Sequence, residues 1–245
     1  SSGINTVLVN GNSNRILGGE SADIINIQSG SDNSIMGNDG DDIITISSAN
    51  NNVYGGDGKD TIIMDASNSA SYTIDGGSGD DLIYIKGSSS TGLINGGSGN
   101  DEIVVTGSDN TNIATGSGND SIINQGNNNA FVNSGGNDVI NEEGSSVLTG
   151  INTINIIGSK GSFTLTETKE VEVKHNKNTY TIKAEQPNTS VDYQQSSATL
   201  VLGINNADIK TTRNEAANLT INGSNNNVSL ADSGDTSLTI NGNNN

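Results

Sequence analysis

The sequence predicts an all-β fold: a right-handed parallel β-roll, or β-solenoid, with coils of about 19 residues, followed by a further β segment. Three observations support this prediction. A stretch of the form Gly-Gly-x-Gly-x-Asp recurs between residues 18 and 142. Apolar residues lie at constant distances from the Asp of each copy. Hydrophobic residues make up only 30% of the 245 residues and aromatic residues 3%, which is low for a conventional globular core.

The Asp residues of the repeat form a column whose members are 18 to 21 positions apart: Asp23, Asp42, Asp60, Asp81, Asp101, Asp120 and Asp138. An apolar residue precedes each Asp by seven positions: Ile16, Ile35, Val53, Ile74, Ile94, Ile113 and Phe131. Another follows each Asp by two positions: Ile25, Ile44, Ile62, Ile83, Ile103, Ile122 and Ile140. A coil of this length fits two short strands and two turns, with side chains alternating inward and outward.

The two turns of the coil differ in their tolerance of length changes. The glycine turn before each Asp never changes length, whereas the opposite connection does, for example between Ile62 and Ile74. Variable length is ordinary loop behaviour. The constant turn therefore indicates a site in which several groups are held in fixed geometry.

The charge of the chain is unevenly distributed. Residues 1–150 hold 19 of the 28 acidic residues and three basic ones, which leaves −16, whereas residues 151–245 hold nine acidic and seven basic residues, which leaves −2. The acidic segment excludes nucleic acid as a partner, because the phosphates would be repelled. The chain has no Cys for disulfides or thiolate metal sites, and no apolar run reaches the ~18 residues of a membrane span.

The Asp column predicts a cation. Neighbouring coils lie ~4.8 Å apart, and two carboxylates about 5 Å apart repel by ~3 kcal/mol at an effective dielectric constant of about 20. A divalent ion between coils turns this repulsion into attraction. Oxygen ligands, and glycines that let carbonyl groups approach an ion, favour calcium. Two alternatives stay open: a chain that is disordered without cation, and a solenoid whose Asp residues only favour turns.

The motif copies 55–60, 76–81 and 96–101, with the variants 37–42 and 115–120, resemble the nonapeptide of repeats-in-toxin (RTX) proteins. That family forms a calcium-dependent parallel β-roll in which two nonapeptides make one coil. This chain keeps one nonapeptide per coil, so the resemblance implies several calcium ions in a single row. It also implies that the seven Asp side chains of the column are ligands, those of Asp23 and Asp138 in degenerate copies. It further implies that backbone carbonyl groups complete the sites at the Gly-x-Gly positions: Gly37, Asp39, Gly55, Asp57, Gly76, Ser78, Gly96, Ser98 and Ser117.

These features predict a non-catalytic, calcium-binding structural segment of a secreted or cell-surface bacterial protein, such as an adhesin, a surface layer or a filament. The resemblance implies that it folds on calcium binding outside the cell. Carboxylate pairs recur in every coil, whereas a catalytic pair is normally singular, and His175 lies in a polar stretch typical of a surface turn. The alternative is the C-terminal secretion and folding module of an exported enzyme or toxin whose catalytic domain lies outside this chain.

A row of apolar residues three positions after the motif Asp is expected to point outward: Ile63, Tyr84, Val104 and Ile123. An exposed apolar row is typical of a contact surface for a protein or cell-surface partner. β-Propensity on a flat sheet explains the same row equally well.

The two ends of the chain carry weaker versions of the repeat. Asn5 lies 18 residues before Asp23, which predicts an initial coil without the ligand. Past Asp138 the spacing breaks, so we divide the chain into a calcium-binding β-roll at 1–158 and a calcium-free β segment at 159–245. The second segment is expected to contain strands at 163–165, 171–173 and 180–182, the last two joined by a hairpin turn at 175–178.

A 19-residue period returns late in the chain, with repeats that start at Leu200, Leu219 and Leu238. The period favours a second short solenoid. An independent β-sandwich is the alternative for this segment.

Overall fold

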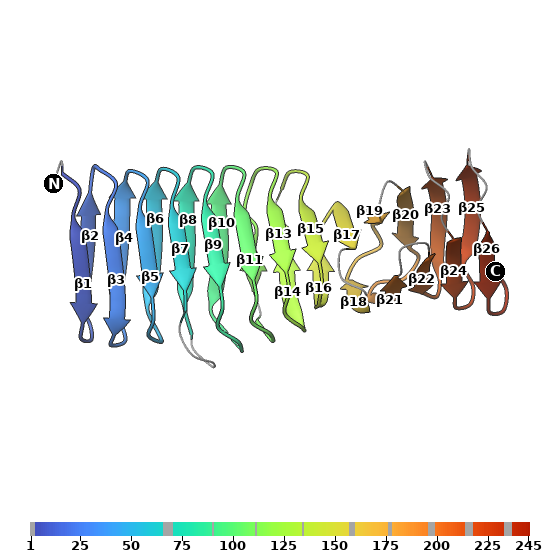
Figure 1. The fold of residues 1–245 in the computed structure, drawn as a ribbon, viewed down its shortest axis with the longest axis horizontal. Helices are drawn as coiled ribbons and strands as arrows, with labels where there is room; N and C mark the ends of the chain where they lie inside the picture. Colours follow the sequence, from blue (N-terminus) through green and yellow to red (C-terminus); the bar gives the residue numbers. More distant parts are fainter. Residues whose placement is uncertain are drawn as a thin grey trace. The chain divides into compact units, whose positions relative to one another are not determined.

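The computed structural model describes residues 3–65, 71–89, 91–110, 112–133, 135–156, 160–175, 178–195, 199–213, 218–232 and 237–245. These residues form strands and turns and no helix, so none of them offers a helical membrane span. The chain forms two compact units, Ser1–Asp138 (unit 1) and Val139–Asn245 (unit 2). The predicted all-β solenoid of roughly 19-residue coils is confirmed (Figure 1).

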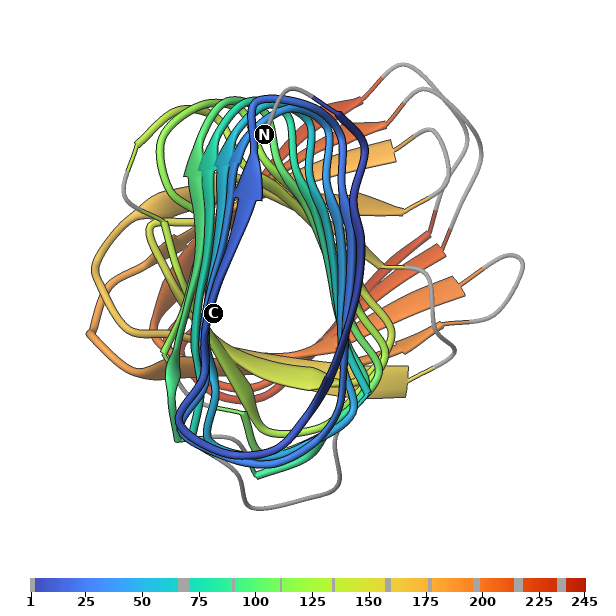
Figure 2. The same ribbon diagram turned by 90° about the vertical axis from the view of Figure 1, so that its left-hand side faces the viewer.

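The strands of unit 1 alternate between two sheets, and neighbouring strands within each sheet are parallel. The first sheet contains β1 (Thr6–Asn10), β3 (Ile24–Ser29), β5 (Ile43–Ile46), β7 (Thr61–Met64), β9 (Leu82–Ile85), β11 (Glu102–Val105) and β13 (Ser121–Asn124). The second contains β2 (Arg15–Gly19), β4 (Ser34–Asp39), β6 (Asn52–Asp57), β8 (Thr73–Ser78), β10 (Leu93–Ser98), β12 (Ile113–Ala114) and β14 (Asn129–Val132). Each coil thus gives one strand to each sheet, and Figure 2 shows these coils superposed along the stack.

The core of unit 1 consists of the two apolar columns that the sequence predicted. In the first sheet, Ile44 pairs with Ile25 and Ile62, and all three are fully buried. In the second sheet, Ile35 pairs in the same way with Ile16 and Val53. Identical offsets in every coil put like residues in register, so the interior is a stack of aliphatic layers that buries apolar surface coil by coil.

The predicted initial coil without the motif Asp is also confirmed. β1 pairs in parallel with β3, with Val7 opposite Ile25. Asn5 takes the place of the motif Asp at the start of this coil, and its backbone N–H and Nδ2 donate to Asp23 Oδ1 at 2.6 and 2.8 Å.

The strands of unit 2 also lie in two sheets. The first contains β15 (Val139–Glu142), β17 (Thr153–Ile156), β19 (Glu170–His175), β20 (Asn178–Ala184), β23 (Ala207–Arg213) and β25 (Asn227–Asp232). The second contains β16 (Ser145–Thr149), β18 (Lys160–Leu165), β21 (Thr189–Gln195), β22 (Thr199–Gly203), β24 (Asn218–Asn222) and β26 (Leu238–Asn241). The strands predicted at 163–165, 171–173 and 180–182 are confirmed within β18, β19 and β20.

Two consecutive strands of unit 2 run against their neighbours. β20 is antiparallel to β19 and β23, and β21 is antiparallel to β18 and β22. The coil that β20 and β21 form therefore winds against the coils before and after it. The predicted hairpin between β19 and β20 accounts for the first reversal, although residues 176–177 of its turn lie outside the described residues.

The returning 19-residue period is confirmed as parallel coils. Leu219 of β24 pairs in register with Leu200 of β22 and Leu238 of β26, and β23 pairs in parallel with β25. The end of unit 2 is therefore solenoid rather than an independent sandwich. The domain boundary at residue 158 stays a prediction beside the division of the compact units after Asp138.

Polar side chains enter the core of unit 2. Glu142 is fully buried and accepts the backbone N–H of Gly144 at 2.9 Å, while the Tyr193 hydroxyl donates to the Glu142 carbonyl oxygen at 3.0 Å. Burial raises the pKa of Tyr193. His175 lies in β19 and is only 3% exposed, so its predicted place in a surface turn was wrong. Polar residues flank His175 in the sequence, but side chains of a strand alternate between its two faces, and His175 lies on the inward face of β19 with Val171 and Val173.

Candidate metal site

The seven Asp residues of the column point into unit 1 at one edge, where they are at most 2% exposed. Each Oδ1 accepts the backbone N–H of the equivalent residue in the preceding coil. Asp42 N–H donates to Asp60 Oδ1 at 2.8 Å, Asp60 N–H to Asp81 Oδ1 at 2.7 Å, and Asp81 N–H to Asp101 Oδ1 at 2.9 Å. The same bond recurs from Asn5 to Asp138, which gives a continuous ladder along the edge.

The second carboxylate oxygen behaves differently. Oδ2 is buried and has no hydrogen-bond partner among the described residues in six members of the column: Asp23, Asp42, Asp60, Asp81, Asp101 and Asp120. Such oxygens are costly, because a buried polar atom without a partner loses its hydration and gains nothing in return.

A backbone carbonyl oxygen lies near each of five of these Oδ2 atoms. A Cβ atom built on Gly76 would lie 2.4 Å from Asp81 Oδ2 and 2.1 Å from the carbonyl oxygen of Gly96 in the next coil. The same arrangement recurs at Gly18, Gly37, Gly55 and Gly96, at 2.0 to 2.5 Å from both oxygens. The first Gly of the motif is therefore required by close approach, since any side chain would fill the space between two acceptor oxygens.

Burial and crowding weaken the acidity of the column. Desolvation, opposed by the backbone hydrogen bond and reinforced by neighbouring carboxylates, raises the pKa of Asp81 to about 7 and those of Asp60 and Asp101 to about 6. Desolvation likewise raises the pKa of Asp42 and Asp120. A site that resists ionisation in this way gains from any positive charge placed beside it.

Asp138, at the end of the column, has a different environment. Thr115 is the first residue of the copy that ends at Asp120, where earlier copies have Gly, and its hydroxyl donates to Asp138 Oδ2 of the next coil at 2.9 Å. A side-chain donor from the preceding copy therefore occupies the second oxygen of Asp138.

The side chains of the other predicted site residues lie away from the buried carboxylates of the Asp column. The side chains of Asp39, Asp57, Ser78, Ser98 and Ser117 are exposed. The carbonyl oxygens of the last four accept the N–H of a motif Gly in the preceding coil at 2.8 to 2.9 Å. Such a carbonyl keeps a second lone pair. The structure thus brings together the Asp carboxylates and the first glycines of the motif.

The donor set of each coil suits a hard cation. It consists of one carboxylate oxygen and neighbouring carbonyl oxygens, and calcium prefers oxygen ligands of both types. Nowhere among the described residues do three acidic or His side chains gather in one cluster. An ion here would take one Oδ2 from a coil and draw its other ligands from backbone or water.

The opposite edge of unit 1 carries a second ladder, which the sequence reasoning missed. Asn14 N–H donates to Asn33 Oδ1 at 2.9 Å, and Asn110 N–H donates to Asn129 Oδ1 at 2.9 Å. The signal was present, because Asn14, Asn33 and Asn129 each stand two residues before an inward apolar residue. Asn is also a common loop residue, which hides this pattern.

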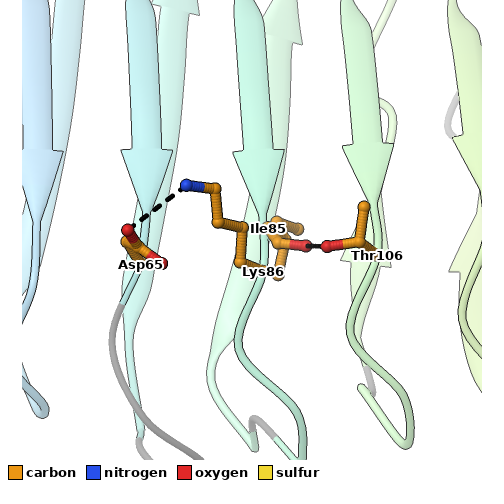
Figure 3. A network of polar contacts seen from close by, with 4 residues as sticks. All are labelled: Asp65, Ile85, Lys86 and Thr106. Atoms are coloured by element: carbon orange, nitrogen blue, oxygen red, sulfur yellow. Dashed lines mark hydrogen bonds and ion pairs between the residues drawn. The ribbon is translucent and has the colours of Figure 1, made fainter.

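The outward row of unit 1 is stacked in register, as Tyr84 pairs with Ile63 on one side and Val104 on the other. All four of its members, Ile63, Tyr84, Val104 and Ile123, are half-buried. Lys86 Nζ lies 5.4 Å from the centroid of the Tyr84 ring. It also forms an ion pair with Asp65 Oδ2 at 3.2 Å, which Figure 3 shows. The lysine thus covers part of the row.

Comparison of the chain with protein-family models and with curated protein sequences gives no match. The resemblance to RTX repeats therefore rests on the motif residues themselves and stays a prediction.

Proposed function

We propose that unit 1 is a non-catalytic, calcium-stabilised structural solenoid of the RTX type. The observation that carries the proposal is the row of six buried Oδ2 atoms, which have no hydrogen-bond partner among the described residues and mostly lie near a glycine carbonyl oxygen. Two acceptor oxygens that face each other need a cation or a proton between them. Calcium ions in a single row along the Asp edge meet this need in every coil at once.

The residues that would hold the ions are Asp42, Asp60, Asp81 and Asp101 through Oδ2, with Asp23 at the first motif copy. Asp120 would hold an ion in a narrower space, because Thr115 stands where the other copies have the first Gly. Gly37, Gly55, Gly76 and Gly96 contribute carbonyl oxygens and the space that a side chain would fill. Asp138 binds more weakly, because its second oxygen already accepts the Thr115 hydroxyl. When bound, calcium neutralises the column and joins neighbouring coils.

A calcium requirement fits a protein that folds outside the cell, where calcium is abundant. We therefore place the chain in a secreted or cell-surface bacterial protein such as an adhesin, a surface layer or a filament. The equivalence of the carboxylates in successive coils supports a structural role over catalysis. The half-buried row of Ile63, Tyr84, Val104 and Ile123 is our proposed contact surface for a protein or cell-surface partner.

The proposal is tested by titrating calcium while circular dichroism and the melting temperature (Tm) are followed, with chelator as the baseline and magnesium as competitor. Each independent site should add about 2.7 kcal/mol to the free energy of unfolding at a calcium concentration of 100 times Kd. Magnesium should stabilise far less, because it demands octahedral geometry and sheds water reluctantly. Equal melting temperatures in calcium and chelator would exclude calcium as the structural ion.

A matched pair of variants locates the response. Replacing Asp81 and Asp101 by Ala should reduce the calcium-induced rise in Tm, whereas Asp109→Ala in the opposite turn should preserve it. Asp109 has an exposed side chain and accepts a hydrogen bond from Asn128 Nδ2 at 3.0 Å. An equal loss of response in both proteins would show that the ions do not lie at the Asp edge.

A further inference from the structure

Part of the second edge of unit 1 uses the same hydrogen-bond ladder as the Asp edge, with Asn in place of Asp at Asn33, Asn51 and Asn129. At both edges a side-chain Oδ1 accepts the backbone N–H of the equivalent residue one coil earlier, at 2.8 Å from Asp42 to Asp60 and 2.9 Å from Asn110 to Asn129. Asp and Asn have nearly the same shape, so the first half of the ladder is indifferent to the choice between them. The second half is not, because the amide ends in a donor and the carboxylate in an acceptor.

At the Asn edge the second side-chain atom is satisfied by the protein. Asn129 Nδ2 donates to the Gly107 carbonyl oxygen at 2.9 Å and to Asn124 Oδ1 at 2.8 Å. Asn110 Nδ2 donates to the Gly87 carbonyl oxygen at 3.1 Å. Unit 2 repeats the device, since Asn226 Nδ2 donates to the Ile204 carbonyl oxygen at 2.8 Å. These ladders need no outside charge.

At the Asp edge the corresponding atom is an acceptor that points at acceptors. Asp81 Oδ2 and the Gly96 carbonyl oxygen converge on one point, and Asp60 Oδ2 and the Gly76 carbonyl oxygen do the same one coil earlier. Asp60 Oδ2 and Asp81 Oδ2 are both buried and have no hydrogen-bond partner among the described residues. An amide Nδ2 in place of Oδ2 would put a donor at this point and remove one charge from the column.

We infer that the Asp column forms the same hydrogen-bond ladder as the Asn residues but has the acceptor Oδ2 where Asn has the donor Nδ2. The lack of this donor makes the fold of unit 1 depend on an added cation. Compared with Asn, each Asp lowers the stability of the calcium-free fold and makes the stability rise when calcium binds. Asn at the same positions would yield a solenoid that is stable on its own and unresponsive. This inference rests on the proposed calcium function, but its test compares the melting temperatures of variants in the absence of calcium.

The test compares the Tm of the full chain in chelator at neutral pH for wild type, the double variant Asp81→Asn with Asp101→Asn, and the double variant Asp81→Ala with Asp101→Ala. The Asn variant should melt above wild type, by about 2 to 4 °C for each substitution. The Ala variant should melt below the Asn variant, because it loses the Oδ1 acceptor as well. An Asn variant that melts at or below wild type in chelator would overturn the inference.

The reciprocal variant is Asn129→Asp, which keeps the Oδ1 acceptor and removes the Nδ2 donor at the other edge. Its Tm in chelator should fall below that of wild type, and saturating calcium should leave the deficit in place, because the turn before Asn129 lacks the Gly-Gly-x-Gly motif. A deficit that calcium abolishes would contradict the assignment of ion binding to the motif edge. An unchanged Tm in chelator would contradict the importance of the second donor.

Failure of this inference is distinct from failure of the proposed function. Wild-type Tm that does not rise with calcium would sink the calcium function, whatever the order of the variants in chelator. A calcium response in wild type, together with an Asn variant less stable than wild type in chelator, would sink the ladder inference alone.

Discussion

The two edges of unit 1 differ by one side-chain atom in the coils where an Asn ladder faces the Asp column, such as those of Asn33 and Asn129. At the Asn edge the side-chain amide donates to an oxygen of the protein, as Asn129 Nδ2 does to the Gly107 carbonyl oxygen and Asn33 Nδ2 to Asn51 Oδ1. At the Asp edge six side chains, among them Asp81, end in a buried oxygen that has no hydrogen-bond donor among the described residues. If the proposed function holds, one solenoid combines an edge whose hydrogen bonds are completed within the protein and an edge that needs a cation. The choice between Asp and Asn at a single column would then set the conditions under which the coils stack.

The largest effect in this comparison is expected when the space at the Asp edge is filled. In Gly76→Ala the new Cβ would lie 2.1 Å from the Gly96 carbonyl oxygen and 2.4 Å from Asp81 Oδ2. We expect a loss of about 3 kcal/mol or more in the free energy of unfolding, and a weaker calcium response, measured by denaturation in calcium and in chelator. Gly135→Ala is the control, because no atom lies within 4 Å of its Cβ position. Equal effects of the two substitutions would refute the close-approach role of the first glycine.

Acid should stabilise the calcium-free Asp edge. The pKa of Asp81 is raised to about 7 and those of Asp60 and Asp101 to about 6, mainly by burial, against 3.8 for an ordinary Asp. The folded state thus binds protons more tightly than the unfolded chain, and this stabilisation is complete below about pH 4 and lost as the pH rises through 6 to 7.

Thermal melts in chelator between about pH 4.5 and 8 measure this dependence. We expect the Tm to fall as the pH rises, and saturating calcium to flatten or reverse the trend, because the ion competes with the proton for the carboxylate. A Tm in chelator that climbs steadily over this range would mean that the column is ionised and satisfied without calcium.

The outward row allows a smaller test away from both edges. Tyr84 and Val104 are half-buried, and Lys86 lies over the Tyr84 ring. Replacing Tyr84 and Val104 by Ser should lower the free energy of unfolding by about 1 kcal/mol through lost cross-strand packing and leave the calcium response intact. A change in self-association or in adhesion to cells would mark the row as a contact surface. Unchanged association in sedimentation and adhesion assays would leave β-propensity as its explanation.

The smallest effect is expected at an acid of the Asn edge. Asp32 has an exposed side chain, a positive φ of 60° and a hydrogen bond from Ser31 Oγ at 2.8 Å. Because Asn tolerates the same backbone conformation, Asp32→Asn should change the free energy of unfolding by no more than about 0.5 kcal/mol in calcium or in chelator. A large loss of calcium response in this variant would extend the ion sites to the second edge.

Much of unit 1 could be predicted from the sequence, because its fold repeats one local rule. Constant offsets around Asp42 and its equivalents fix the strand register, and the apolar columns follow from strand alternation. The hydrogen-bond state of each Asp could not be predicted, since it depends on how the next coil lies against it. The Asn ladder escaped for the same reason: Asn33 and Asn129 look like loop residues until their amides are placed beside the neighbouring coil.

Unit 2 was harder to predict because its rule changes within the segment. The pairing of Leu200, Leu219 and Leu238 followed from the 19-residue period. The reversed direction of the coil formed by β20 and β21 is indicated in the sequence only by the hairpin turn near residue 175. The buried positions of His175 and Glu142 break the aliphatic pattern on which core prediction relies.

The central claim is that ions bind along the Asp edge of unit 1 and nowhere along the Asn edge. Crystals grown in calcium, with anomalous scattering measured to locate the ions, test it most directly. The account predicts a single file of calcium ions, each contacting an Asp Oδ2 such as that of Asp81 and a carbonyl oxygen such as that of Gly96. Ions on the Asn edge, or an Asp edge without ions at saturating calcium, would contradict it.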